Sequence, residues 1–123
     1  PVPRTRAMLE ILIENVHLVE ADLPVPLALE NISALFDWPG AELDEAAFLS
    51  ELLARTEAML LLDLENIYAN TRNLGGDPVA FLEKLPLDRV GYVHLAGGRD
   101  VAGVYHDTHT EPIPDEVFAL LQE

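Results

Sequence analysis

The sequence predicts a single α/β domain built on a parallel sheet, and three observations support this. Amphipathic helical segments alternate along the chain with short apolar runs that are typical of buried strands. Half of the 123 residues are apolar, which is enough to bury a core of ordinary proportions. The chain has no cysteine, and its apolar runs stop far short of the roughly 20 residues that a membrane span needs. We therefore expect a cytoplasmic protein without disulfides or a membrane partner.

The first predicted unit is a helix followed by a strand. Residues 4–22 place apolar side chains three and four positions apart, which predicts an amphipathic helix packed on a sheet. Residues 23–32 form a dense apolar run between prolines. Such a run is typical of a strand buried in a parallel sheet, and we expect it to end near Glu30.

The second unit has the same order. Asp44 is a suitable N-cap for an amphipathic helix over residues 45–56. The apolar run at residues 58–63 predicts the second strand. The polar residues 65–76 that follow predict a long loop.

The third unit begins with Asp77 and Pro78, which are typical of the N-cap and first position of a helix over residues 79–85. Residues 90–95 predict the third strand, closed by a flexible Ala-Gly-Gly. A final helix is expected within residues 112–123, where proline and acidic residues precede an apolar stripe.

The charge balance excludes one class of partner. Seven basic residues oppose twenty-two acidic ones, which gives a formal net charge of −15. Proteins that bind nucleic acid usually present a basic face, so we expect no nucleic-acid partner. The acidic excess is a solvated surface or, in part, a set of metal ligands.

Three polar residues fall where predicted strands end: Glu30, Asp63 and His94. The carboxyl ends of parallel strands meet at one edge of a sheet, which is where ligands bind in α/β folds. Taken singly, each residue has an ordinary structural explanation. A carboxylate after a strand can cap a helix, and a lone histidine in an apolar strand can be a hydrogen-bonded core residue. Together they predict a metal-binding edge.

A second group of candidates follows the third strand. Asp107 and His109 are two positions apart, so in an extended segment both side chains point the same way and can hold one ion or bridge two. Carboxylates and imidazoles without thiolates suit iron(II), manganese(II) or zinc(II), and the number of donors favours two or more ions. Asn66 is a possible further ligand or a support for the ligands, although it is as readily a turn residue.

Other polar residues are weaker candidates. His17 lies within the first predicted helix, and His106 faces away from the Asp-x-His pair if that segment is extended. Tyr68, Arg72 and Asn73 are polar candidates for substrate contact. The sequence assigns no catalytic or substrate-binding residue.

Several motifs recur in one order along nearly the whole chain: LENISALFDWPG, LLLDLENIYANTRN, YVHLAGG and DTHTEPIPDEVFALL. With these motifs the sequence resembles the multinuclear nonheme iron-dependent oxidases, a family long catalogued without a function whose members include MbnB and TglH. The resemblance implies a TIM-type barrel of the xylose-isomerase-like kind, with two or three iron ions at the carboxyl ends of its strands.

The resemblance also implies a ligand set. The implied metal ligands are Glu30, Asp63, His94, Asp107 and His109, with Asn66 beside them. Glu65 departs from the pattern, because similar sequences often have asparagine there. This departure leaves the contribution of that loop open.

The length sets a limit on what this chain does alone. A complete (β/α)8 barrel needs about 250 residues, roughly twice the chain. We therefore expect residues 1–123 to form one partial barrel domain of about three to four strands with flanking helices, a fragment of a longer parent. The resemblance implies that the parent uses iron and dioxygen to modify cysteine residues of a ribosomally made peptide, which a partner protein presents.

For the isolated fragment we expect little or no metal binding and no turnover, because it holds only part of the ligand cage. An incomplete barrel exposes sheet edges and an inner apolar face, so we also expect a homo-oligomer. Two alternatives stay open. The parent is a manganese or zinc isomerase or hydrolase on the same barrel, or the chain is a non-enzymatic acidic α/β module whose strand-end residues are only caps.

Overall fold

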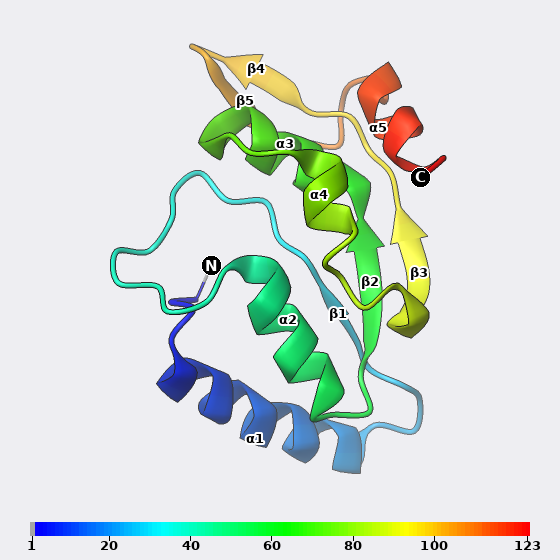
Figure 1. Cartoon of the computed structure of the whole chain (residues 1–123). Helices are drawn as coiled ribbons and strands as arrows, with labels where there is room; N and C mark the ends of the chain where they lie inside the picture. The colour runs from blue at the N-terminus through cyan, green and yellow to red at the C-terminus, as the bar shows by residue number, and fades with distance from the viewer. Residues whose placement is uncertain (1) are drawn as a thin grey trace.

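The computed structural model describes residues 2–123 and has a mixed α/β architecture (Figure 1). In these residues a three-stranded parallel sheet has the order β1-β2-β3, formed by Ala28–Glu30, Met59–Asp63 and Val90–His94. Asp63 lies opposite His94 in the pairing of β2 with β3. The predicted α/β class and parallel sheet are confirmed, and within the described residues the sheet is open and does not close into a barrel.

Helices flank and connect the strands. The helices of residues 2–123 are α1 (Arg6–Asp22), α2 (Glu45–Ala54), α3 (Leu64–Leu74), α4 (Pro78–Leu82), the 3-10 helix η1 (Leu87–Arg89) and α5 (Asp115–Leu120). Nowhere in this part of the chain is a helix both long and apolar enough to cross a membrane.

The helix starts confirm the predicted capping chemistry. The Asp44 carboxylate accepts a hydrogen bond from the backbone N–H of Ala47 at 2.8 Å and so caps α2. The Asp77 carboxylate accepts hydrogen bonds from Val79 and Ala80, and Pro78 occupies the first position of α4. These side chains satisfy backbone N–H groups that have no partner within the helix.

Residues 65–76 are not the long loop that the sequence predicted, because most of them belong to α3. The strand passes directly into this helix: Asp63, the last residue of β2, accepts a hydrogen bond from Asn66 N–H at 2.8 Å. Leu64 and Ile67 are buried one helical turn apart, while the intervening and following residues are mostly polar. The apolar stripe is therefore narrow, and polarity alone concealed it.

A second feature was not predicted. β4 (Arg99–Val101) and β5 (Val104–His106) form an antiparallel hairpin beside α3 (Figure 1). Its turn residues, Ala102 and Gly103, have φ angles of 54° and 84°. Each strand has only three residues, so no alternating pattern long enough to identify it exists in the sequence.

The two faces of the sheet differ. Leu60 and Leu62 of β2 are buried in a core that the helices supply. Side chains alternate along a strand, so Leu61 and Asp63 lie on the opposite face. The register places Glu30 beside Leu61 and His94 beside Asp63. The three predicted strand-end residues therefore share one face, at the carboxyl end of the sheet.

Candidate metal centre

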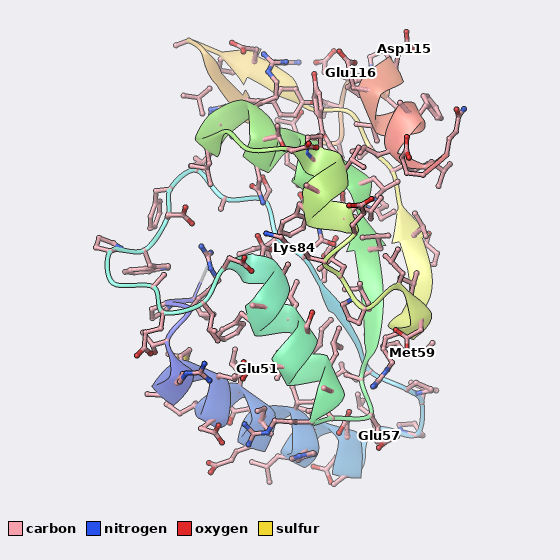
Figure 2. The ribbon with its side chains drawn as sticks, in the orientation of Figure 1. Glu51, Glu57, Met59, Lys84, Asp115 and Glu116 are labelled. Carbon is pink, nitrogen blue, oxygen red and sulfur yellow. The ribbon has the colours of Figure 1, made fainter. Side chains whose placement is uncertain are left out.

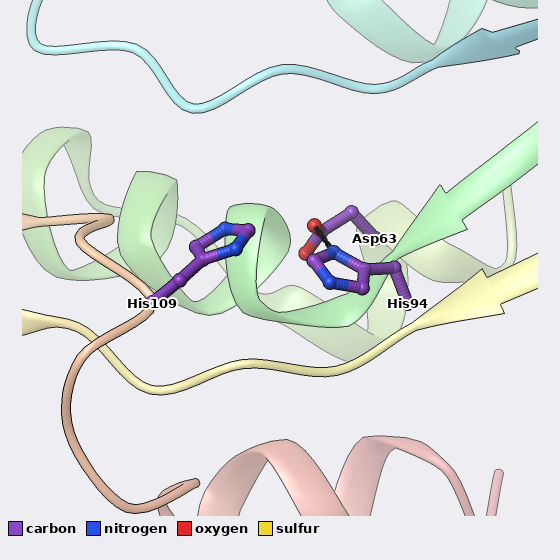
Figure 3. Close-up of side chains that lie close together, drawn as sticks. All are labelled: Asp63, His94 and His109. Carbon is purple, nitrogen blue, oxygen red and sulfur yellow. Dashed lines mark hydrogen bonds and ion pairs between the residues drawn. The ribbon is translucent and has the colours of Figure 1, made fainter.

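Asp63 connects the end of β2 to the end of β3. Its Oδ2 lies 2.6 Å from Nδ1 of His94 (Figure 3). Its Oδ1 accepts the hydrogen bond from Asn66 N–H that caps α3. The residue is fully buried. The predicted helix cap is confirmed, and the second oxygen of the same carboxylate contacts His94, another predicted ligand.

Asn31 holds the ends of β1 and β2 together. Its Oδ1 accepts a hydrogen bond from Asp63 N–H at 2.9 Å, and its Nδ2 donates to the Asp63 carbonyl at 2.8 Å. Asn66 Nδ2 donates to the Asn31 carbonyl at 2.9 Å. All three residues are buried. The sequence analysis missed Asn31, although Leu-Glu-Asn occurs at both 29–31 and 64–66, at the point where an apolar strand ends in each case.

Glu30 lies beside this pair. Its carboxyl group is within hydrogen-bonding reach of Asp63. Loss of solvent and then the neighbouring Asp63 raise the pKa of Glu30, whereas His94 opposes the shift. The pKa of His94 is raised in turn, chiefly by its hydrogen bond to Asp63. Each group therefore favours a proton when no other cation is near.

His109 reaches the same place from the segment after β5. Its φ angle is 55°, so the extended backbone assumed for residues 107–109 is wrong: the chain turns at His109. The predicted pair nevertheless meets, with Nε2 of His109 2.7 Å from Oδ1 of Asp107. The rings of His109 and His94 are 4.8 Å apart between centroids (Figure 3). One candidate ligand atom each from Asp63, His94 and His109 lies within 4.8 Å of the others.

Glu65 is an unexpected member of the site. It forms a second group with Asp107 and His109, again with ligand atoms within 4.8 Å of one another. Its side chain is fully buried. Burial, and then the adjacent carboxyl group of Asp107, raise the pKa of Glu65 to about 7. The sequence analysis noted Glu65 only as a departure from a family pattern. The repeated Leu-Glu-Asn is the signal in the sequence that could have identified Glu65 as a site residue.

Several of the weaker candidates make contacts within the fold. Asn73 exchanges two hydrogen bonds with the backbone of Tyr105 and so ties β5 to α3. Arg72 lies over the rings of Tyr68 and Tyr105 and donates a hydrogen bond to the Tyr68 hydroxyl at 3.0 Å. His17 forms an ion-pair contact with a glutamate on its own helix. These contacts give each residue a structural role, and its contact with a substrate stays a prediction.

The donor set fits a first-row divalent metal. It consists of carboxylate oxygens and imidazole nitrogens without a thiolate. Among the described residues, three buried oxygens in this region accept no hydrogen bond: Oε2 of Glu65, Oδ1 of Asn66 and Oδ1 of Asp107. A buried acceptor without a donor is costly unless something else occupies its lone pairs. We call the following residues the carboxylate–histidine cluster: Glu30, Asp63, Glu65, His94, Asp107 and His109.

Known proteins with similar sequences share one family. The family model described as "RiPP precursor modification enzyme MbnB/TglH/ChrH" matches residues 1–123. A UPF0276 protein of Streptomyces avermitilis is 49% identical over 123 residues, which cover 100% of this chain and 25% of that protein. A UPF0276 protein of Caulobacter vibrioides is 40% identical over 122 residues, 99% of this chain and 44% of that protein.

A third relative also matches the whole chain over less than half of its own length. A UPF0276 protein of Chromobacterium violaceum is 39% identical over 123 residues, which cover 100% of this chain and 45% of that protein. The chain thus spans less than half the length of these three curated relatives.

Proposed function

The chain belongs to the MbnB/TglH/ChrH family of RiPP precursor modification enzymes, and from this premise we propose that the complete protein is a nonheme iron-dependent oxidase. Its substrate would be a cysteine-containing, ribosomally made peptide presented by a partner protein. One observation supports this most strongly: Asp63, His94 and His109, from three separate segments, bring their ligand atoms within 4.8 Å of one another.

The residues that would hold iron are Glu30, Asp63, His94, Asp107 and His109, with Asn66 beside them. When bound, iron would supply the redox chemistry that oxidation of a thiol by dioxygen requires. Asp63 would orient His94: an N–H at Nδ1 directed at Oδ2 leaves the lone pair of Nε2 for a metal.

Asn31 and Asn66 would hold the Asp63 carboxylate in place through the hydrogen bonds that connect the strand ends. Such outer contacts fix the direction of a ligand and reduce the reorganisation needed when a metal binds. The metal-binding geometry would thus be built largely from the backbone junction between β2 and α3.

The open sheet would be part of a TIM-type barrel. Helices supply the core on one face, while Glu30, Asp63 and His94 share the other face at the carboxyl end, which in such a barrel is the inner face and the catalytic end. Further strands would cover that face in the complete protein. In a preparation of residues 1–123 alone, a second copy would cover it; size-exclusion chromatography with light scattering that gives a monomer at high concentration would contradict this.

Metal analysis of the complete protein, purified without added metal, tests the proposal. We expect iron and a visible charge-transfer band, together with dioxygen consumption and a change in peptide mass when the precursor peptide and partner are added. A colourless protein containing zinc or manganese would favour an isomerase or hydrolase. If the double substitution Asp107→Ala and His109→Ala left the metal content unchanged, a non-enzymatic module would be favoured instead.

A further inference from the structure

The segment between β1 and α2 is long, and its first part is firmly held. Residues 31–44 connect the two elements without a helix or strand of their own. Asn70 of α3 donates a hydrogen bond to the Ile32 carbonyl at 2.8 Å and accepts one from Ala34 N–H at 2.7 Å. The Glu45 carboxylate accepts a hydrogen bond from Ile32 N–H at 3.0 Å. Connections longer than about 12 residues without secondary structure are uncommon in compact domains and are usually functional.

The far part of the segment is anchored by Arg4. The guanidinium group of Arg4 donates a hydrogen bond to Oδ1 of Asp37 at 2.5 Å and another to the Leu43 carbonyl at 3.3 Å. The Arg4 carbonyl accepts hydrogen bonds from the backbone N–H groups of Glu42 and Leu43, at 3.0 and 3.1 Å. The backbone on both sides of Phe36 is therefore fixed by contacts within the chain.

This segment buries a small side chain and exposes large ones. Ala34 is 5% exposed, whereas Leu35, Phe36 and Trp38 are 53%, 49% and 36% exposed. The rings of Phe36 and Trp38 meet edge to face, with centroids 5.5 Å apart. Figure 2 shows side chains of this segment extending away from the rest of the molecule. A segment that served only the core would bury its largest apolar side chains, because they contribute most to stability. We call Leu35, Phe36 and Trp38 the apolar loop patch.

The size of the apolar loop patch fits a peptide better than a folded protein. A large apolar side chain presents about 200 Å², so the exposed parts of these three add up to roughly 300 Å². A stable interface between two folded proteins covers about 800 Å² on each partner. An area of a few hundred Å² is enough for two or three residues of an extended peptide, and aromatic side chains are common anchors at such surfaces.

The patch is continuous with the candidate metal centre. The segment that carries it begins directly after Glu30, and Asn31 ties its start to Asp63 through two hydrogen bonds. Figure 3 shows the coil after β1 running alongside the site. In α/β folds, ligands bind among the loops at this end of the sheet. A peptide with one residue at the metal centre can therefore place its neighbouring residues along this segment.

The charge of the chain restricts the composition of that peptide. Twenty-two acidic residues oppose seven basic ones. The basic side chains beside the segment are already paired: Arg4 with Asp37, and Lys84 with Asp44 at the start of α2 (Figure 2). An acidic peptide would be repelled, so the residues that contact the patch should be apolar with neutral or basic neighbours.

We propose that Leu35, Phe36 and Trp38 bind apolar side chains of the precursor peptide, close in its sequence to the cysteine that reaches the metal centre and in a stretch without acidic residues. This inference rests on the proposed function in taking a peptide as the substrate. It does not depend on the identity of the metal or on the reaction.

Photo-crosslinking in the complete protein tests the proposal, with p-benzoylphenylalanine in place of Phe36. The protein is irradiated without dioxygen, in the presence of the precursor peptide encoded beside its gene and of the presenting partner. Mass spectrometry should find the crosslink on an apolar residue of the precursor peptide near a cysteine. The matched control carries the same replacement at Phe118, which is 44% exposed on α5, and should give no crosslink to the peptide. A crosslink from position 36 only to the partner or to a second copy, or none at all, would overturn the proposal.

Steady-state kinetics give a second readout. Phe36→Ala and Trp38→Ala should each raise the KM for the precursor peptide by about tenfold, because an aromatic anchor is lost, while kcat and metal content stay near the wild-type values. Phe118→Ala is again the control and should leave KM unchanged. An unchanged KM in both loop variants would count against the proposal. Benzoylphenylalanine keeps the aromatic ring, so the crosslink decides the question if an alanine variant does not fold.

Failure of the proposed function can be told apart from failure of this inference. A peptide crosslink at position 36 in a protein that neither contains iron nor consumes dioxygen would retain the docking surface and exclude the oxidase. An active iron oxidase without that crosslink, and with an unchanged KM in Phe36→Ala, would retain the function and exclude this surface.

Discussion

The two ends of the parallel sheet differ in how their polar groups are paired. At the amino end, the guanidinium group of Arg89 donates hydrogen bonds to the carbonyls of Leu53, Thr56 and Ala58, at distances of 2.9, 3.0 and 2.6 Å. One cation thus donates to three backbone acceptors. At this end of the sheet, these buried acceptors are hydrogen-bonded within the protein.

At the carboxyl end, acceptors outnumber donors. The carboxylate–histidine cluster gathers four carboxylates and two imidazoles, and among residues 2–123 no lysine or arginine pairs with any of them. Buried polar groups at the amino end of the sheet are paired with one another and stabilise the fold. Those at the carboxyl end have acceptors left over, which a cation could occupy. Substitutions at the amino end should therefore reduce stability, and substitutions in the cluster should chiefly reduce metal binding.

The largest loss of stability is expected for Arg89→Met. Methionine keeps much of the apolar stem but removes the three hydrogen bonds to these carbonyls, so the free energy of unfolding should fall by about 3 kcal/mol. Urea unfolding measures this, and the metal content of the folded fraction should not change. Arg55→Met removes an exposed pair with Glu10 and should leave stability unchanged within error. A loss of less than about 1 kcal/mol at Arg89 would remove the contrast between the two ends.

Asn31→Ala should reduce both the stability of the fold and the affinity for metal. It removes the two hydrogen bonds to the Asp63 backbone, so we expect a loss of about 2 kcal/mol. Because Asp63 is then held less firmly, metal affinity should also fall by about tenfold. Isothermal titration with manganese(II), beside urea unfolding, separates the two effects; an unchanged affinity would show that Asn31 is structural only.

Asp63→Asn should reduce metal affinity much more than stability. Asparagine is also a good N-cap, so α3 keeps its first hydrogen bond and the metal-free protein should change in stability by less than about 1 kcal/mol. Metal affinity should fall by about 100-fold, because a charged ligand and the orientation of His94 are lost together. A variant that loses stability but not metal would mean that the cap is the main role of Asp63.

The last prediction concerns pH. In the metal-free protein the pKa values of Glu30, Glu65 and His94 are all raised, so the folded state binds more protons than the unfolded chain. For Glu65, stability should therefore fall as pH rises from 4.5 to about 7. Urea unfolding in the presence of a chelator, between pH 5 and 8, should show a weaker decline for Glu65→Gln than for the wild type. Parallel declines would contradict this.

The sequence predicted most of what depends on local pattern. The spacing of apolar residues identified α1, and the N-caps Asp44 and Asp77 marked the starts of α2 and α4. Apolar runs identified the parallel strands, and their ends identified Glu30, Asp63 and His94 as neighbours.

What the sequence could not predict depends on contacts between distant segments. α3 was missed because its buried stripe is narrow and Asp63 was interpreted as a strand end and not also as a cap. The turn at His109 was missed because no glycine marks its positive φ. Glu65 was set aside because its burial requires Tyr105 and Gly98, which lie more than thirty residues away and approach only in the folded chain.

Anomalous X-ray diffraction at the iron absorption edge, from crystals of the complete protein with iron bound, tests the central claim most directly. We expect anomalous peaks in contact with Asp63, His94, Asp107 and His109. Crystals of a protein shown to contain iron, but without anomalous density at the carboxylate–histidine cluster, would contradict the account.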